Sequence, residues 1–322
     1  MKIAVVSSLC LPVGTEGYKG LERIVYYLAK GYKELGHEVT VFGAKGSVVP
    51  HGVELVEVSD ADWSLSAEFK YAELDFSGFD FIHDNTWLHL PALRYGNALA
   101  THHAPDPPLP LVVRFPERLV CVSKAHSDYI ENRYGVKPRF VHHGLEIEDY
   151  PFRVEKEDYV LFLNRISVEK GALSFANICE ELGLKGIIAG EDVNVEDRHY
   201  VWKVIKACRN YCEFWGRVDE KEKLDLLSHA KAVVSLSGCE KEWLEVFGLF
   251  ALESLSCGTP VLAYRKSGGV LEIIDEGSGA IFSYPYELGR LVKLDFDPYA
   301  CRRRAEQFTY KKMVEKLSLI HI

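Results

Sequence analysis

Short runs of apolar and β-branched residues alternate along this chain with longer stretches in which apolar residues recur every three or four positions. In the first half, the apolar runs predict strands at residues 3–7, 38–42, 53–58, 80–84, 98–102, 118–123 and 139–143. The longer stretches predict helices at 21–35 and 124–134. In the first of these, Ile24, Leu28 and Leu35 share one face, and Gly36 ends the helix.

The same alternation starts again in the second half. Strands are predicted at 159–163, 186–189, 212–215, 232–236 and 260–263, and helices at 171–182, 219–229 and 248–256. Short, nearly all-apolar strands that alternate with helices are typical of parallel sheets covered on both faces. Two such series predict two doubly wound α/β domains.

The predicted joint lies near residues 149–157, a charged stretch that carries a proline. We therefore expect an N-terminal domain at 1–150 and a second domain at 151–296. One or two helices are expected in the remaining segment, 297–322.

Length and composition agree with this organisation. The 322 residues suit two domains of roughly 150 residues each. Apolar residues make up 48% and charged residues 26%, as in an ordinary globular protein. The net charge of −9 argues against nucleic acid as a partner, because a sequence-independent binder needs a basic surface.

The N-terminal segment M-K-I-A-V-V-S-S is apolar only briefly, so it predicts a buried first strand rather than a signal peptide. No stretch approaches the ~20 apolar residues of a membrane span. We expect a cytoplasmic protein. The eight cysteines include no C-x-x-C pair, which favours small buried hydrophobic residues over a zinc site or a structural disulfide.

The most informative stretch is 243–272, which carries two glutamates around a predicted helix start. Gly248 opens this helix, and its unpaired N–H groups, with that of Leu249, suit a diphosphate. Glu253 lies ~7 Å further along the helix at ~1.5 Å per residue, within reach of a ribose. Glu245 precedes the helix and would face a sugar or the attacking group. Two glutamates at this spacing alone indicate only a solvated helix.

This stretch resembles the signature of the retaining glycosyltransferases of family 4. The matching positions are Glu245, Phe247, Gly248, Glu253, Gly258, Pro260, Val261, Ala263, Gly268, Gly269 and Glu272. The chain departs from it at 254–256, where the family prefers Ala-Met-Ala. The resemblance implies the GT-B fold, in which two Rossmann-like doubly wound domains face each other across a cleft. It also implies a final helix, 297–322, that packs back on the N-terminal domain.

A basic pair follows the first predicted strand of the second domain. Arg165 and Lys170 would lie at the carboxyl end of this strand, where two cations can neutralise a departing diphosphate. Such a pair alone is usually just solvated, but it resembles the family's G-R-x-x-x-x-K-G block, with Asn164 in place of the first glycine. No D-x-D metal clamp is evident, so we expect no metal and no cofactor.

Other strand ends carry further candidate residues for binding the nucleotide sugar. These are Gly190 after one strand and Gly216, Arg217 and Val218 after the next, together with Phe247 in the stretch described above. In the family, backbone groups at the strand end that corresponds to Gly216 face the base of the nucleotide.

Two blocks of the first half also resemble the family. L-P-V-G-T-E-G-Y-K-G-L-E-R resembles its glycine-rich loop, with Gly20 retained and Lys19 in place of the preceding glycine. His102 and His103 end another strand, and the resemblance favours His103 as the histidine near the donor sugar. In a later block that resembles the family's N-G-x-D, His143 replaces the asparagine.

The resemblance implies a retaining hexosyltransferase that uses a nucleotide-diphosphate sugar and an acceptor hydroxyl. Glu245, His103, Arg165 and Lys170 are its expected catalytic residues. The acceptor is a sugar, a lipid or a small molecule, and peripheral contact with a membrane stays open. Two alternatives remain: a sugar-nucleotide epimerase or phosphorylase on the same fold, and a non-catalytic binding module.

Overall fold

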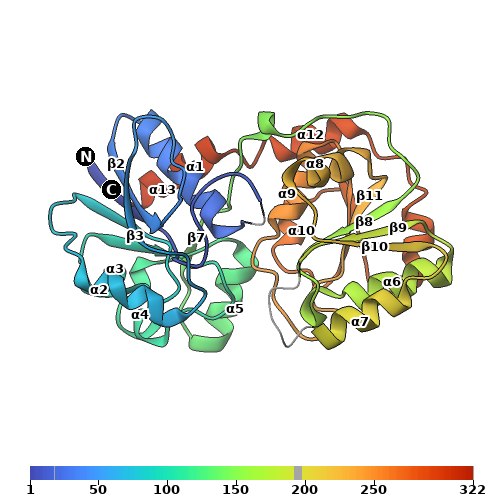
Figure 1. Ribbon diagram of the computed structural model, residues 1–322, viewed down its shortest axis with the longest axis horizontal. Coiled ribbons are helices and arrows are strands. Elements are labelled where there is room, and N and C mark those ends of the chain that lie inside the picture. The colour runs from blue at the N-terminus through green and yellow to red at the C-terminus, as the bar shows by residue number, and fades with distance from the viewer. Residues whose placement is uncertain (18, 192–197, 322) are drawn as a thin grey trace. The chain divides into compact units, whose positions relative to one another are not determined.

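The computed structural model describes residues 1–17, 19–191 and 198–321. The chain divides into two compact units (Figure 1). Unit 1 comprises Met1–Leu145 and Thr309–Ile322, and unit 2 comprises Glu146–Phe308. The chain therefore leaves unit 1, forms unit 2 and returns to unit 1 for its last described helix.

Unit 1 contains a seven-stranded sheet in which every described strand pairing is parallel. Its order is β3-β2-β1-β4-β5-β6-β7. The strands are β1 (Lys2–Val6), β2 (Glu38–Ala44), β3 (Glu54–Ser59), β4 (Phe81–Asp84), β5 (Ala98–Thr101), β6 (Leu119–Cys121) and β7 (Arg139–Phe140). The residues of β4, β5 and β6 are all buried, as expected for strands covered on both faces.

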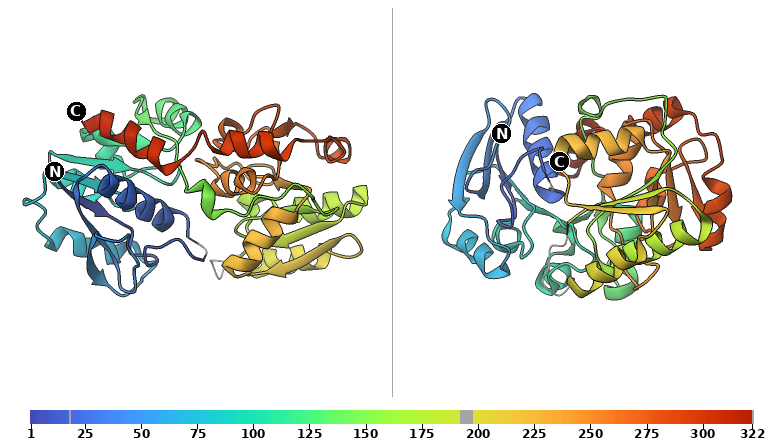
Figure 2. Two further views of the ribbon diagram at one scale, coloured as in Figure 1. Left: turned by 90° about the horizontal axis from the view of Figure 1, so that it is seen from above. Right: turned by 45° about the vertical axis from the view of Figure 1, so that its right-hand side comes forward.

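The helices of unit 1 are α1 (Leu21–Glu34), α2 (Lys70–Glu73), α3 (Leu90–Arg94), α4 (Leu109–Arg114), α5 (Lys124–Tyr134) and α13 (Tyr310–His321). Helices α1 and α13 lie side by side although they come from opposite ends of the chain (Figure 2). A Cβ atom on Gly31 of α1 would lie 2.6 Å from Val314 Cγ2 of α13. The glycine therefore allows the close approach of the two helices.

Unit 2 contains a six-stranded parallel sheet in the order β10-β9-β8-β11-β12-β13. The strands are β8 (Val160–Leu163), β9 (Gly186–Ala189), β10 (Cys212–Gly216), β11 (Ala232–Ser235), β12 (Val261–Tyr264) and β13 (Gly279–Phe282). Strand order reverses direction between β8 and β11, which is the switch point of a doubly wound sheet.

Helices cover both faces of this sheet (Figure 1). They are α6 (Ala172–Leu182), α7 (Arg198–Ala207), α8 (Glu220–His229), α9 (Leu249–Ser256), α10 (Val270–Ile273), α11 (Leu288–Leu291) and α12 (Pro298–Ala305). Helices α6 and α7 pack together on one face, and α9 packs with α8 and α12 on the other. The start of α8 is fixed by a capping box, in which Asp219 and Glu222 each accept a hydrogen bond from the other's backbone N–H.

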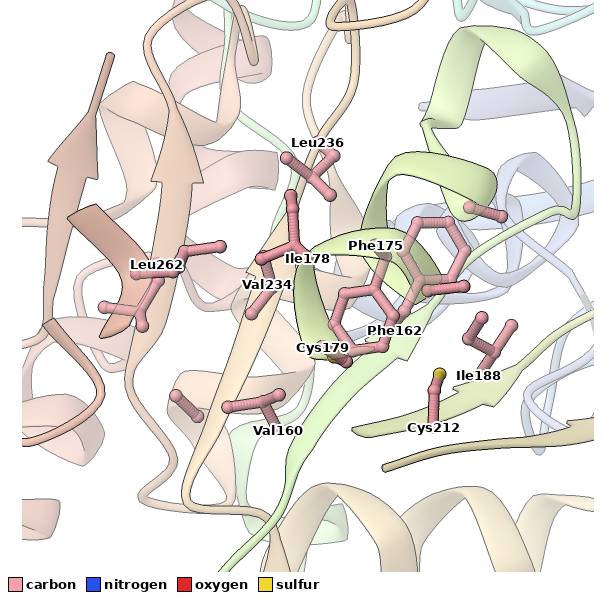
Figure 3. Packing of buried hydrophobic residues seen from close by; sticks show 14 of the residues in the cluster. Val160, Phe162, Phe175, Ile178, Cys179, Ile188, Cys212, Val234, Leu236 and Leu262 are labelled. Carbon is pink, nitrogen blue, oxygen red and sulfur yellow. The ribbon is translucent and has the colours of Figure 1, made fainter. Parts of the chain in front are cut away.

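The core between the sheet and α6 is formed by aromatic and β-branched side chains (Figure 3). Phe162 of β8 and Phe175 of α6 are each 1% exposed, with ring centroids 5.6 Å apart. Gly186 leaves room for Cys179, because a Cβ atom there would lie 2.5 Å from its Sγ atom. All eight cysteines of the chain have free thiols.

The expected fold class, two Rossmann-like doubly wound units, is confirmed. Sequence patterns missed β13 and α7, and the last strand of unit 1 is shorter than predicted, because it pairs only over Arg139–Phe140. The segment after 297 forms two helices, α12 and α13.

Candidate active site

Two loops meet at the switch point of the unit 2 sheet. One follows β8 and carries Arg165 and Lys170, and the other follows β11 and leads to Glu245. Because β8 and β11 are neighbours and parallel, their carboxyl ends lie at the same edge of the sheet. Ligands of doubly wound sheets bind at this edge.

The structure brings Lys170 into direct contact with Glu245. The Lys170 Nζ atom donates a hydrogen bond to Glu245 Oε2, and both residues are less than 10% exposed. Ser237 Oγ donates a second hydrogen bond to the same oxygen, at 3.0 Å. The ammonium group also lies 5.8 Å from the ring centre of Trp243. This side of the site is therefore a buried, hydrogen-bonded ion pair with an aromatic wall.

Helix α9 starts beside this ion pair. Its N-cap residue Gly248 has φ of 91°, and no side chain caps the helix there. A Cβ atom on Gly248 would lie 3.5 Å from Glu245 Cγ and 2.4 Å from Val270 Cγ2. The left-handed φ and the close contact both require glycine. The predicted helix terminus is thus present, and it lies next to Glu245.

A pair of glycines supports the segment that carries Glu245. Gly269 N donates a hydrogen bond of 2.7 Å to the Glu245 carbonyl oxygen. A Cβ atom on Gly268 would lie 2.4 Å from that same oxygen. The turn after β12 therefore presses against the backbone before α9, which only glycine permits at this distance.

Arg165 is held by a neighbour in its own loop. Its Nη2 atom donates to Glu169 Oε1, while its buried Nε atom has no hydrogen-bond partner among the described residues. Burial raises the pKa of Glu169, but its own backbone N–H and the Arg165 charge outweigh this and hold the pKa below its ordinary value. Arg165 is thus oriented by a carboxylate and keeps donor capacity for an anion.

Glu253 lies on α9 and is 7% exposed. Its Oε1 atom accepts hydrogen bonds from Tyr150 OH at 3.1 Å and from Lys223 Nζ at 3.0 Å. Lys223 also pairs with Glu220 on its own helix, at 2.8 Å. The second glutamate of the site is therefore also ion-paired, with a cation that comes from α8.

The other predicted residues of unit 2 lie around these groups or at the adjacent strand ends. Gly190 follows β9 and donates from its N–H to the carbonyl of Gly216, which ends β10, at 2.8 Å. Arg217 pairs with Glu191 at 3.2 Å and is largely exposed. The remaining predicted residues are Val218 and Phe247, which are buried, and Leu249, which begins α9.

The predicted residues of unit 1 lie at the carboxyl edge of its own sheet. Gly20 is the N-cap of α1, and Lys19 folds over the loop so that its Nζ atom lies 3.3 Å from a Cβ atom built on Gly14. Burial lowers the pKa of Lys19. Glu22 of α1 is buried and accepts a hydrogen bond of 2.7 Å from Ser8 Oγ.

The two adjacent histidines have different surroundings. His102 is 2% exposed and its Nδ1 atom lies 2.9 Å from His89 Nε2. His103 is half-buried, and its two ring nitrogens contact His143 and Asn85. Strand β5 ends at Thr101, so the two side chains belong to the loop beyond it.

Several residues of these contacts were missed by sequence reasoning. They are Ser237, Trp243, Tyr150, Lys223, Glu169 and Asn85. Glu169 had a detectable signal, since it lies four residues after Arg165, the spacing of a local ion pair. Ser237 and Trp243 lie in the same loop as Glu245, but no local pattern indicates their contacts with the Lys170–Glu245 pair. Tyr150, Lys223 and Asn85 make their contacts from distant elements, and nothing in the local sequence indicates them.

Among the residues that the structure describes, no group of three or more His, Cys, Asp or Glu side chains is arranged to hold a metal ion. No described helix has the length and apolar character needed to cross a bilayer.

Comparison with known proteins identifies the family. The model of the family described as "Glycosyl transferases group 1" matches residues 146–293, and that of "Glycosyltransferase Family 4" matches residues 18–149. Together they account for most of both units. The chain belongs to the family 4 glycosyltransferases.

Curated relatives of this glycosyltransferase include the glycogen synthases of two Mycobacterium tuberculosis strains. Each is 28% identical over 214 residues, which cover 60% of this chain and 49% of the relative. The matched part thus spans about half the length of these relatives.

Solved structures share the fold across nearly the whole chain. AviGT4, a glycosyltransferase involved in avilamycin A biosynthesis, has a TM-score of 0.79 at 24% identity and covers 99% of this chain and 96% of its own. Sucrose-phosphate synthase from Thermosynechococcus elongatus has a TM-score of 0.75 at 18% identity, covering 99% and 98%. Anabaena HepE, in complex with UDP and glucose, has a TM-score of 0.71 at 17% identity, covering 99% and 98%.

Proposed function

We propose that this glycosyltransferase moves a hexosyl group from a nucleotide-diphosphate sugar to an acceptor hydroxyl and retains the anomeric configuration. The observation that carries the proposal is the Lys170–Glu245 pair beside the uncapped start of α9. An ammonium group and a helix N-terminus together attract a phosphate.

The diphosphate is bound by N–H donors and positive charges that remain available beside the ion pairs of the site. Lys170 carries three N–H donors, so it can keep Glu245 and donate to a phosphate oxygen as well. Arg165 keeps its Nε donor and adds a second positive charge. These two cations and the amides of Gly248 and Leu249 stabilise the diphosphate as it departs, in the role that a divalent metal has in other transferases.

Transfer breaks the bond between the anomeric carbon and the β-phosphate oxygen and forms a bond from that carbon to the acceptor oxygen. The acceptor proton passes to the departing phosphate oxygen on the same face of the sugar, which retains the configuration. Glu245 is occupied by Lys170 and Ser237, so it stabilises positive charge on the sugar rather than attacking it.

The nucleoside is bound further along α9. Glu253 accepts hydrogen bonds from the ribose hydroxyls, in an orientation set by Tyr150 and Lys223. Main-chain groups near Gly190 and Gly216 receive the base. We therefore propose a UDP- or GDP-sugar as donor, and the UDP and glucose bound by HepE support the first of these.

The acceptor is a sugar, a lipid or a small molecule. A cytoplasmic location, with peripheral contact with a membrane for a lipid acceptor, completes the proposal.

A ligand screen followed by a transfer assay tests this function. Thermal unfolding is first recorded with UDP, GDP, ADP and their glucose or mannose conjugates, because a bound ligand raises the apparent stability. The preferred donor is then incubated with a panel of acceptors, and the anomeric configuration of the product is read by NMR. We expect one nucleotide to raise the melting temperature and the product to keep the donor's configuration. An inverted product would contradict retention, and no response to any nucleotide diphosphate would contradict the donor class.

A further inference from the structure

His103 lies in a chain of three side chains at the carboxyl edge of the unit 1 sheet. Asn85 follows β4, His103 follows β5 and His143 lies beyond β7. His103 Nε2 lies 3.1 Å from Asn85 Oδ1, and His103 Nδ1 lies 3.2 Å from His143 Nε2. Both ring nitrogens of His103 are therefore used by the protein.

The orientation of Asn85 fixes where the proton of His103 lies. Asn85 Nδ2 donates a hydrogen bond of 3.2 Å to the carbonyl oxygen of His83. The opposite orientation of the amide would place two oxygens against each other. Asn85 Oδ1 must therefore face His103, and as an acceptor it requires the proton of His103 on Nε2.

The remaining nitrogen of His103 is then an acceptor. With the proton on Nε2, the Nδ1 atom of a neutral imidazole carries a lone pair, so the hydrogen bond from His143 must be donated by an Nε2–H group. The two rings are nearly parallel, with planes 14° apart and centroids 5.0 Å apart. A proton on His103 Nδ1 would face the proton of His143 and break this arrangement.

The surroundings oppose a charged His103 from every side. The titratable groups that act on its charge are other histidines: His143, His102, His89 and His83. Burial is the largest cause that lowers the pKa of His103 well below its ordinary value, and these neighbours add to it. Burial, followed by His142 and His126, also lowers the pKa of His143 to about 3. Both rings are neutral at physiological pH.

We propose that His143 is a positioning residue that, together with Asn85, holds His103 as the neutral tautomer with its proton on Nε2. A substrate oxygen that reaches His103 then meets no basic nitrogen, because Nε2 carries the proton donated to Asn85 and Nδ1 accepts from His143. His103 therefore cannot remove a substrate proton, which leaves the departing phosphate as the proton acceptor. The part that concerns the substrate rests on the function proposed above, whereas the tautomer rests on unit 1 alone.

Ring-nitrogen NMR tests the tautomer without any substrate. Long-range ¹H–¹⁵N spectra of the ¹⁵N-labelled full chain distinguish Nδ1–H from Nε2–H and report the charge, and His103→Gln assigns the signal. For the unmodified protein we expect the Nε2–H pattern, unchanged from pH 8 to pH 6. An Nδ1–H pattern, or a ring that becomes charged above pH 6, would overturn the proposal.

Three substitutions at residue 143 separate positioning from simple packing. His143→Asn keeps an N–H donor, His143→Asp offers only an acceptor, and His143→Ala offers neither. We expect His143→Asn to preserve the Nε2–H pattern of His103. His143→Asp should move the proton to Nδ1 and make the His103 ring become charged already above pH 6. If Asp leaves the tautomer unchanged in a folded protein, His143 does not set it. If His143→Asp does not fold, the ring-nitrogen spectra of His143→Asn and of the unmodified protein test the proposal.

Kinetics with the preferred donor separate this proposal from the proposed function. His143→Ala should lower kcat by about 10-fold or more, and Asn should restore most of this loss. His143→Asp should add an acidic limb to the pH profile of kcat. If the protein transfers sugar while its spectra show the proton of His103 on Nδ1, this inference is overturned and the proposed function stands. An Nε2–H pattern in a protein that transfers no sugar would overturn the function and leave the tautomer standing.

Discussion

The two units have the same kind of sheet but present opposite chemistry at its carboxyl edge. In unit 2, buried cations are paired with carboxylates, as in Lys170–Glu245 and Lys223–Glu253. In unit 1, the corresponding edge carries neutral rings and an amide, such as His103 and Asn85. The two edges therefore differ in how these side chains are paired, through ion pairs in unit 2 and through neutral hydrogen bonds around His103 in unit 1.

Under the proposed function, the two edges meet different chemical groups. A diphosphate needs positive charge, and paired cations remain charged even when buried. A sugar is neutral, and neutral hydrogen-bonding groups recognise its hydroxyls without attracting phosphate. The sheets position the loops, and the residues that follow each strand determine the chemistry.

The largest expected effect is on the charged edge. Lys170→Ala removes a phosphate contact and the partner of Glu245, so kcat/KM should fall by about 10³-fold, the loss typical of a group that stabilises a departing anion. Lys241→Ala serves as the control, because Lys241 is exposed and lies shortly before Glu245 in the sequence. If the unpaired Glu245 impairs folding, Lys170→Ala combined with Glu245→Gln keeps the test valid. Activity within a few fold of the unmodified enzyme would mean that the ion pair is only structural.

A second effect concerns the stability of unit 2. Lys223→Met leaves the buried Glu253 without its cation, which should lower the free energy of unfolding by about 3 kcal/mol. Urea denaturation measures this, with the exposed Lys221→Met as a matched control on the same helix. Adding Glu253→Gln should recover most of the loss. No recovery would show that Lys223 acts through packing rather than charge.

A third effect tests the backbone at the start of α9. Gly248→Ala forces a side chain into the left-handed region and to 2.4 Å from Val270 Cγ2, which should cost about 2 kcal/mol of stability. Gly78→Ala meets no atom within 4 Å and is the control. The melting temperatures of both variants measure the difference, and equal values would contradict the tight packing described here.

The last effect is the response of each unit to acid. Burial lowers the pKa of His126 to about 4 and that of His143 to about 3, below the ordinary value of 6.5. The unfolded chain therefore binds protons first, and these two histidines lower the stability of unit 1 as the pH falls from about 6.5, each by at most about 1.4 kcal/mol per pH unit. Glu68, whose pKa burial raises to about 7, acts in the opposite direction. Glu169 has a lowered pKa, so its contribution to unit 2 is kept at neutral pH and is lost only below about 4.5.

Hydrogen exchange followed by mass spectrometry measures this difference between the units. After correction for the intrinsic pH dependence of exchange, unit 1 peptides should lose protection between pH 6.5 and pH 5 while unit 2 peptides keep theirs. His126→Asn should reduce the pH dependence in unit 1. If unit 2 peptides lose protection at a higher pH than unit 1 peptides, the comparison is reversed.

The sequence predicted the parts of the fold and site that have local signals. Alternating apolar runs located most strands within one or two residues, because strands buried on both faces must be apolar. The helix start at Gly248 and the cations Arg165 and Lys170 were predicted because their local sequences resemble motifs of the family.

The parts it missed depend on contacts between distant elements. Strand β13 has an exposed residue, Ile281, at the sheet edge, so its pattern lacks the full burial of the other strands. Lys223 of α8 was not among the predicted residues, and it contacts Glu253, thirty positions away in the sequence. The tautomer of His103 depends on Asn85 and His143, which only the fold of unit 1 brings to the same place.

The central claim is that the carboxyl edge of unit 2 binds a diphosphate through its cations. Calorimetric titration with the nucleotide diphosphate that the screen prefers tests it most directly, in the unmodified protein and in Arg165→Ala, with the exposed Arg290→Ala as a matched control in the same unit. The account predicts binding that Arg165→Ala weakens at least 10-fold and Arg290→Ala leaves nearly unchanged. Equal affinity of the unmodified protein and Arg165→Ala would contradict it.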